Sequence, residues 1–256
     1  MDAHNGIAET LVPLLLEVDV PDEVKPARAL LAEWDLRQTA DSAAAAYFAA
    51  VWRHLLERTF RDDLPADAEI DGEDRWMEVV RRLATDPDAQ WWDDADTEPR
   101  ENRNDMLRAA LVDAHAELSD QLSDDPEQWR WGRLHTLAMR HMTLGSSGVP
   151  FIEWMFNRGS VELGGGSSIV NANGWNMAEG YGVVWVPSMR MVVDLFDWDA
   201  SRWVTTTGAS GHAFSGHYTD QVRHWADGGS VPMRWSRPAV RAGEQDHLVL
   251  VPADVD

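Results

Sequence analysis

Apolar residues recur at helical spacing in the first part of the chain. One apolar stripe predicts a helix that begins after Asp41 or Ser42, either of which is a good N-cap, and that runs to about Phe60. The stripe consists of Phe48, Trp52, Leu55, Leu56 and Phe60. Similar stripes predict helices near residues 76–83 and over residues 107–122. We therefore expect residues 1–125 to form a helical segment.

Two acidic stretches separate these predicted helices. Residues 62–72 and 93–101 are rich in Asp and Glu, and they contain Pro65 and Pro99 respectively. Charged residues favour water, and proline interrupts regular structure. We therefore interpret both stretches as solvated connections.

The pattern changes after Pro126. Glycines become frequent, and short apolar runs predict strands at 169–172, 183–186 and 189–195. Weaker runs predict strands at 203–207 and 248–251, and a short helix is expected over residues 218–226. Residues 126–256 are thus predicted to be a strand-rich segment with Gly-rich loops.

The order of these elements indicates the fold class. Helices come first and strands follow, whereas a parallel α/β sheet would show the two alternating along the chain. We predict an α+β fold with a helical first half and a strand-rich second half. The two segments are expected to form one structural unit.

The charge of the chain argues against two classes of partner. The sequence has 44 acidic residues against 22 Lys and Arg, which gives a formal net charge of -22. Because Lys and Arg supply most of the affinity for phosphate backbones and anionic lipids, we expect neither nucleic acid nor membrane as a partner. No apolar run reaches the roughly 18 residues of a membrane span. The Met1–Gly6 stretch also lacks the pattern of a signal peptide.

The sequence contains no cysteine, which excludes disulfides, thiolate zinc sites and a cysteine nucleophile from this chain. His212, His217, Asp220 and His224 lie within thirteen residues of one another. One interpretation is a zinc or iron site, although no pair has the spacing that places two imidazoles on one helical face. The favoured interpretation is that these side chains hydrogen-bond the backbone of a Gly-rich loop.

Two further motifs allow a functional and a structural interpretation. His135 and His141 flank the apolar residues 137–139, and a hydrogen-bonded core histidine is favoured over a general base there. The Gly-rich residues 164–168 lack the lysine of a phosphate-binding loop. We therefore predict a turn before the strand expected at Ile169.

The stretch from Asp194 to Trp225 carries a more specific pattern. It contains Ser210-Gly211-His212, followed by Ser215-Gly216-His217-Tyr218-Thr219-Asp220-Gln221 and then Trp225. This stretch resembles the C-terminal region of the penicillin acylase (penicillin amidase) family of N-terminal-nucleophile hydrolases. The segment Pro187-Ser188-Met189-Arg190 with Asp194 fits the same resemblance, whereas Ala209 stands where the family usually has Gln.

Other segments agree with the resemblance in the same order along the chain. The Asp41–Ala45 sequence with Trp52 is similar to a helical segment of the family. Trp131-Gly132 with His135 and His141 resembles its Trp-Gly-x-x-His motif, and Ile169–Ala172 resembles a Thr-Val-Asn-Ala strand. The resemblance therefore spans almost the whole chain.

The resemblance implies a fold and a reaction. Such enzymes have a four-layer α-β-β-α sandwich and hydrolyse an amide to a carboxylic acid and an amine. The precursor cuts itself into two chains, and the newly exposed N-terminal Ser, Cys or Thr is the nucleophile, with its own α-amine as the base. A backbone N–H and an Asn side chain form the oxyanion hole.

This chain departs from the family pattern at the catalytic residues. The sequence has no Ser-Asn dipeptide, which begins the catalytic chain in the family. The family's oxyanion Asn, acyl pocket and calcium ligands all belong to segments upstream of the part that this chain resembles. We therefore expect no catalytic residue, no metal ligand and no cofactor in this chain.

The matched motif residues are predicted to have structural roles. They are His135, His141, Asn171, Arg190, Asp194, Ser210, Gly211, His212, His217, Tyr218, Asp220 and Gln221. The expected partners are the remainder of the same enzyme, namely its α chain and the N-terminal part of its β chain, and an amide small-molecule substrate. The resemblance implies a periplasmic or secreted location.

Three hypotheses follow for function. The main hypothesis is the C-terminal segment of a penicillin-acylase-family amidohydrolase, inactive alone. The first alternative is a non-catalytic scaffold or interaction module derived from that fold. The second is a metal hydrolase that uses His212, His217 and Asp220.

Overall fold

The computed structural model describes residues 2–252. The chain divides into two compact units, residues 1–186 and residues 187–256, and each is described by itself. The helices of the first unit are α1 (Ala8–Glu17), α2 (Lys25–Ala32), α3 (Ala43–Phe60), α4 (Asp74–Leu83), α5 (Arg103–Gln121), α6 (Trp131–Leu134) and α7 (Pro150–Phe156), with single 3-10 turns at Gln90–Trp92 and Pro126–Gln128. Its strands are β1 (Thr136–Ala138), β2 (Ser160–Glu162), β3 (Gly174–Trp175) and β4 (Val183–Trp185).

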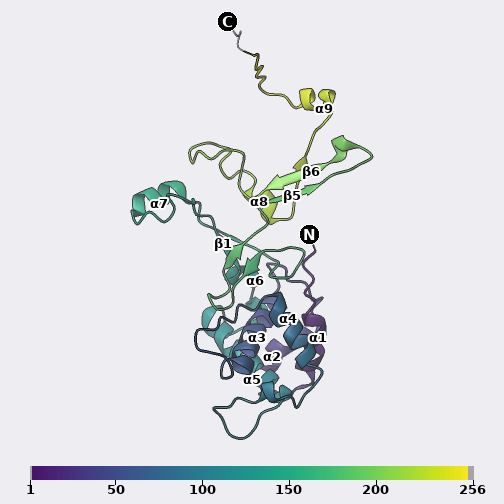
Figure 1. The fold of residues 1–256 in the computed structure, drawn as a ribbon, viewed down its shortest axis with the longest axis vertical. Helices are drawn as coiled ribbons and strands as arrows, with labels where there is room; N and C mark the ends of the chain where they lie inside the picture. Colours follow the sequence, from purple (N-terminus) through teal and green to yellow (C-terminus); the bar gives the residue numbers. More distant parts are fainter. Residues whose placement is uncertain (1, 253–256) are drawn as a thin grey trace. The chain divides into compact units, whose positions relative to one another are not determined.

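Helix α3 is the centre of the first unit. The Ser42 hydroxyl accepts a hydrogen bond from the Ala45 amide, which confirms the predicted N-cap, and the helix ends at Phe60 as predicted. The alanines in its first turns let α5 pack closely, and the two helices lie side by side (Figure 1). The Tyr47 hydroxyl, buried at this contact, donates to the Leu111 carbonyl at 2.8 Å. The predicted helices at 76–83 and 107–122 are confirmed as α4 and α5.

Tertiary packing alters the predicted connection at 62–72. Ile70 is fully buried, and the Trp52 indole donates to the Gly72 carbonyl at 3.0 Å. The interpretation of this stretch as a solvated connection is therefore wrong at its end, because an aromatic side chain of α3 holds it against the core. Residues 94–100 are mostly exposed, as predicted.

The strands of the first unit are short and antiparallel. β1 pairs with β2, and β3 pairs with β4, which confirms the strand predicted at 183–186. The strand predicted at 169–172 does not form. Instead, the Asn171 amide donates to the Asp2 carbonyl at 2.8 Å, and the Asn171 carbonyl accepts from the Gly166 amide at 3.2 Å. The hydrogen bond from Gly166 closes a turn, and the one to Asp2 joins this turn to the start of the chain, so residues 169–172 pair with no strand.

The change from helix to strand near residue 126 is not the boundary between the compact units. Trp175, Met177 and Tyr181 belong to the same buried cluster as the residues of α3 and α5. The part of the strand-rich segment that precedes Pro187 therefore completes the helical core. The division between the compact units falls at residues 186 and 187, some sixty residues after the predicted change from helix to strand.

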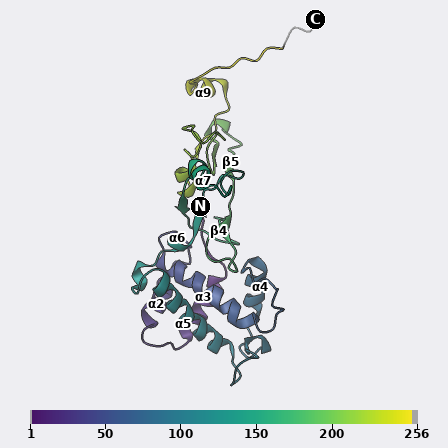
Figure 2. The ribbon, with the colours of Figure 1, turned by 90° about the vertical axis from the view of Figure 1, so that its left-hand side faces the viewer.

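The second unit contains one antiparallel sheet. Its strands β5 (Met189–Val192), β6 (Arg202–Thr205) and β7 (Val231–Pro232) are ordered β5-β6-β7. Its helices are α8 (Val222–Ala226) and α9 (Arg237–Ala242), with a 3-10 turn at Trp198–Ala200. Figure 2 shows the first unit from a second side, in which α3 again lies beside α5.

Three predictions for this unit need correction. The strand predicted at 189–195 ends at Val192, because the Asp194 carboxylate accepts hydrogen bonds from the Phe196 and Asp197 amides and turns the chain. The helix predicted at 218–226 begins only at Val222. Residues 248–251 form no strand, since they find no pairing partner within residues 2–252. The strand predicted at 203–207 is confirmed as β6.

The predicted α+β class is confirmed as far as the mixture of helices and strands is concerned. Helices and small antiparallel sheets are combined, as an α+β fold requires. Among residues 2–252, no helix has the length and apolar character needed to cross a bilayer.

Candidate functional site

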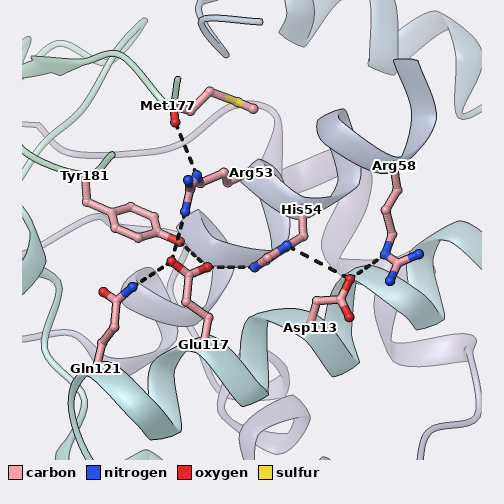
Figure 3. Close-up of polar contacts among 8 residues, drawn as sticks. All are labelled: Arg53, His54, Arg58, Asp113, Glu117, Gln121, Met177 and Tyr181. Carbon is pink, nitrogen blue, oxygen red and sulfur yellow. Dashed lines mark hydrogen bonds and ion pairs between the residues drawn. The ribbon is translucent and has the colours of Figure 1, made fainter. Parts of the chain in front are cut away.

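A partly buried polar cluster of the first unit surrounds the carboxylate of Glu117. Arg53 and His54 come from the middle of α3, Glu117 from the facing turn of α5, and Tyr181 from the loop before β4 (Figure 3). Because α3 and α5 pack side by side, polar residues at the edge of their contact face one another. We call this group the Glu117 cluster.

Four donors occupy the Glu117 carboxylate. Oε1 accepts from Arg53 Nη1 at 2.9 Å and from Gln121 Nε2 at 2.9 Å. Oε2 lies 2.6 Å from His54 Nε2 and 3.0 Å from the Tyr181 hydroxyl. Arg53 also donates through Nε to the Met177 carbonyl at 3.2 Å. The cluster therefore ties α3, α5 and the loop that contains Met177 and Tyr181 together.

The electrostatics of the cluster favour the ionised carboxylate. Burial raises the pKa of Glu117, but hydrogen bonds from His54 and Tyr181 and the charge of Arg53 outweigh it, so the pKa lies below its usual value. Burial lowers the pKa of Arg53, and its contacts with Tyr181 and Glu117 reverse this shift. Burial, followed by the charge of Glu117, raises the pKa of Tyr181. Glu117 is therefore ionised, Arg53 protonated and Tyr181 neutral at pH 7.

This arrangement suits a structural joint better than a reacting group. A carboxylate that already accepts four hydrogen bonds has no vacant position for a substrate proton. The contacts continue along the helices, where His54 Nδ1 lies 4.0 Å from Asp113 and Arg58 Nε donates to Asp113. The sequence pattern does not single out this cluster. Its only signal is a polar pair, Arg53 and His54, that interrupts the apolar run from Ala43 to Leu56.

His135, one of the predicted motif residues, lies in the core of the first unit. Its side chain is fully buried, and its ring stacks on the Trp131 indole with centroids 4.4 Å apart. Nδ1 lies 2.9 Å from the Tyr181 carbonyl, and Nε2 lies 3.0 Å from the Asn173 carbonyl. Burial lowers the pKa of His135 to about 4 against the opposing effect of the two carbonyls. The ring is neutral at pH 7 and therefore donates to only one of the two carbonyls. Its burial and this hydrogen bond agree with the favoured interpretation as a core histidine.

The Gly-rich residues 164–168 form the predicted turn. The Gly165 amide donates to the Gln38 carbonyl at 2.7 Å, and its carbonyl accepts from the Trp131 indole at 2.9 Å. Gly165 has a φ of +88°, and a Cβ there would lie 2.0 Å from the Asn171 carbonyl oxygen. The glycines therefore allow close backbone packing. Asn171 contributes its backbone to this turn, as described above.

His141 stabilises a local turn rather than a site with His135. Its Nδ1 accepts hydrogen bonds from the Thr143 and Leu144 amides at 3.2 and 3.1 Å. The His141 amide donates to Asn157 Oδ1 at 2.9 Å. No contact joins His141 to His135 among the described residues.

In the second unit, Arg190 packs on Trp225. The guanidinium lies 4.5 Å from the centroid of the indole ring, and Nη1 donates to the Trp225 carbonyl at 2.6 Å. Burial lowers the pKa of Arg190. The Trp225 indole donates in turn to the Pro187 carbonyl at 3.1 Å. The predicted motif residues Arg190 and Trp225 thus connect β5 to α8.

Asp194 acts through the turn that ends β5. Hydrogen bonds from the Asp197 and Phe196 amides lower the pKa of its carboxyl group. Its own amide donates to the Ser201 hydroxyl at 3.1 Å.

The loop at residues 207–221 gathers the remaining motif residues, but mainly through local contacts. The Gln221 side chain accepts from the Thr205 amide of β6 at 3.0 Å, and the Ser210 amide donates to the His217 carbonyl at 3.0 Å. His217 Nδ1 lies 2.8 Å from Asp220 Oδ2. Gly211 has open space at its Cβ position, and the Tyr218 amide donates to the Ser215 carbonyl.

The same loop does not assemble the alternative metal site. His212 and His217 are exposed, and His212 Nδ1 accepts from the Phe214 amide. Within residues 2–252, no three His, Asp or Glu side chains are placed to hold one ion. The geometry therefore gives no support to the metal-hydrolase hypothesis.

Comparison with known proteins decides the family. The model of the family described as penicillin amidase matches residues 1–242. The chain belongs to the penicillin amidase family. The resemblance in the Asp194–Trp225 stretch and the order of the earlier motifs agree with this result.

The relatives of this chain include acylases whose names give different substrates. The penicillin acylase 2 proenzyme of Pseudomonas sp. (strain SE83) is 31% identical over 88% of this chain. The acyl-homoserine lactone acylase QuiP of Pseudomonas syringae pv. syringae (strain B728a) is 25% identical over 87% of it. The chain spans about 28% of the length of each of these relatives.

A solved structure supports the fold. The thermostable penicillin G acylase from Alcaligenes faecalis matches with a TM-score of 0.55 at 14% identity, over 100% of this chain and 48% of that one. The fold of this chain is therefore similar to part of a penicillin acylase.

Proposed function

We propose that the chain is the C-terminal segment of an amidohydrolase that cleaves amides to a carboxylic acid and an amine. The observation that carries the proposal is the family match over residues 1–242, combined with a span of about 28% of the curated relatives. The nucleophile and the oxyanion hole then lie on polypeptide outside this chain. The Glu117 cluster and the neutral His135 fit that division, because both are fully engaged in packing contacts.

The proposal includes the architecture and partners of the whole enzyme. The helices and small sheets of this chain form part of a four-layer α-β-β-α sandwich. Its partners are the α chain and the N-terminal part of the β chain, together with the amide substrate. The relatives' names point to acyl-homoserine lactones and penicillins as the first substrates to assay. No cofactor is required in this chain, and a periplasmic or secreted location fits the resemblance.

An activity assay with two preparations tests the proposal. The chain is purified alone and also together with the polypeptide that the adjoining upstream reading frame encodes. Acyl-homoserine lactone and penicillin G are the substrates, and their hydrolysis is measured as the amount of free amine released. We expect no acceleration by the isolated chain and turnover by the combined preparation.

The assay also separates the alternatives. Hydrolysis by the isolated chain would contradict the placement of the catalytic groups outside it. A combined preparation that assembles but hydrolyses no amide would favour the scaffold hypothesis instead.

A further inference from the structure

Strand β5 has an open backbone edge in the second unit. It pairs with β6 in the register Arg190↔Val204 and Val192↔Arg202, and the Thr206 amide donates to the Ser188 carbonyl at 3.0 Å. Hydrogen-bonded pairs alternate along an antiparallel ladder, so Arg190 and Val192 direct their backbone groups toward β6.

The intervening residues point the other way. Met189 and Met191 direct their N–H and C=O groups away from β6, and these groups make no hydrogen bond among residues 2–252. β5 is the first strand in the order β5-β6-β7, so nothing within that sheet pairs with this edge. An unpaired strand edge is a template for another strand.

The side chains at this edge are apolar and accessible. Met189 and Met191 are each 49% exposed, and Phe196, just beyond the strand, is fully exposed. Further exposed apolar side chains in the same stretch are Val192, Val193 and Leu195. An edge that is both unpaired and apolar invites aggregation in an isolated soluble protein, so natural sheets usually cover or charge it.

Only one side of β5 is engaged by its own unit. Arg190 turns toward α8 and packs on Trp225, whereas Met189 and Met191 alternate with it and lie on the opposite face of the strand. The exposed methionines therefore present an apolar face beside the free backbone groups. Main-chain hydrogen bonds and apolar contacts of this kind are how a sheet edge binds an added strand.

We propose that β5 binds an apolar β-strand supplied by the remainder of the amidase polypeptide. This inference rests on the proposed function, because the chain spans about 28% of its curated relatives and the rest of such a protein supplies the strand. A second copy of this chain is disfavoured as the occupant, since a net charge of -22 on each copy opposes self-association. The bound strand pairs with Met189 and Met191 and covers their side chains.

Amide hydrogen exchange tests the proposal directly. The chain is measured alone and after co-production with the polypeptide encoded by the adjoining upstream reading frame. We expect exchange at the Met189 and Met191 amides to be fast in the isolated chain and at least about tenfold slower in the complex. Exchange at the Arg190 and Val192 amides, which face β6, is the internal reference.

A proline substitution separates edge pairing from general stability. Met191→Pro removes an outward N–H and leaves the ladder to β6 intact, whereas the matched control Met191→Val keeps the N–H. We expect Met191→Pro to weaken binding of the upstream polypeptide at least about tenfold and Met191→Val to preserve it. Exchange of the β6 amides in the isolated variant checks the sheet. If proline loosens β6, Met191→Lys keeps the N–H, charges the apolar face and is expected to give the same loss of binding.

Several results would overturn the inference. They are slow exchange of Met189 and Met191 already in the isolated chain, fast exchange in the complex, dimerisation of this chain through β5, or an upstream frame without an acylase segment. If the complex hydrolyses amides but the Met189 and Met191 amides exchange fast, strand binding at β5 is wrong and the proposed function stands. If these amides are protected but the complex hydrolyses no amide, strand binding stands and the proposed function is wrong.

Discussion

The imidazole of His135 stacks on the indole of Trp131, with ring planes 14° apart and centroids separated by 4.4 Å. The Trp131 indole donates in turn to the Gly165 carbonyl. This pair connects the helix α6 to the Gly-rich turn. The motif residue His135 is therefore part of the core packing of the first unit.

The buried His135 predicts a pH dependence of stability. Its folded pKa of about 4 lies below the ordinary value of 6.5, so the unfolded chain takes up the proton first as the pH falls. The stabilisation is fully present above pH 6.5 and is lost between about pH 6.5 and pH 4, up to about 3 kcal/mol. Urea unfolding of wild type and His135→Gln across this range measures it. His4→Gln, at a half-buried histidine outside the core, is the control and should leave this pH-dependent component in place. Equal pH slopes for wild type and His135→Gln would contradict the assignment.

Removing the charge of Glu117 should destabilise the first unit. Glu117→Gln leaves Arg53 without its ion pair and places an amide donor among four donors, so we expect a loss of about 3 kcal/mol in the free energy of unfolding. The partly exposed i,i+4 pair of Glu57 with Arg61 provides the control, and Glu57→Gln should cost under about 0.5 kcal/mol. Denaturant unfolding compares the two variants. Equal losses would show that the Glu117 cluster does not hold α3 and α5 together.

Acid should weaken the Glu117 cluster as well. The pKa of the Glu117 carboxyl group is lowered in the folded state. Its contribution to the free energy of unfolding is therefore present above the ordinary pKa of 4.5 and is lost as the pH falls through the folded pKa. We expect Glu117→Gln to remove part of the acid sensitivity of wild type below pH 4.5. An unchanged acid transition in the variant would argue against an ionised carboxylate.

Two glycines with similar backbone angles predict different costs for alanine. Gly165 and Gly148 have φ values of +88° and +76°, but only at Gly165 would a Cβ meet backbone, at 2.0 Å from the Asn171 oxygen. Gly148→Ala should cost about 1 kcal/mol from backbone strain alone. Gly165→Ala should cost more than about 3 kcal/mol, because the turn must also move. Thermal or denaturant unfolding distinguishes the pair, and similar costs would contradict the close packing.

Arg190 predicts a local effect in the second unit. Arg190→Ala removes the contact with the Trp225 ring and the donor to its carbonyl, so we expect opening of α8 to become easier by about 2 kcal/mol. Arg223→Ala, an exposed arginine on α8 itself, is the control. Hydrogen exchange of the Trp225 amide reports the opening. Equal exchange rates of the Trp225 amide in the two variants would show that Arg190 does not hold α8 against β5.

Local sequence patterns predict the elements whose hydrogen bonds and capping groups lie within one segment. Ser42 caps α3, and apolar spacing places α3, α4 and α5, because a helix satisfies its backbone within one segment. The run at 183–186 likewise appears as β4. By contrast, residues 169–172 and 248–251 look equally extended in sequence but form no strand, because a strand needs a partner that local sequence does not specify.

The sequence by itself determined the family, the helical first half and the histidine motifs, since these depend on residue order and on periodicity. Only the tertiary structure decided that His135 is buried and neutral, that three of the four donors to Glu117 come from distant segments, and that residues up to Val186 complete the helical core. The physical reason is that burial and polar pairing depend on which remote segments meet. That meeting is fixed by the packing of α3 against α5 and not by any single stretch of sequence.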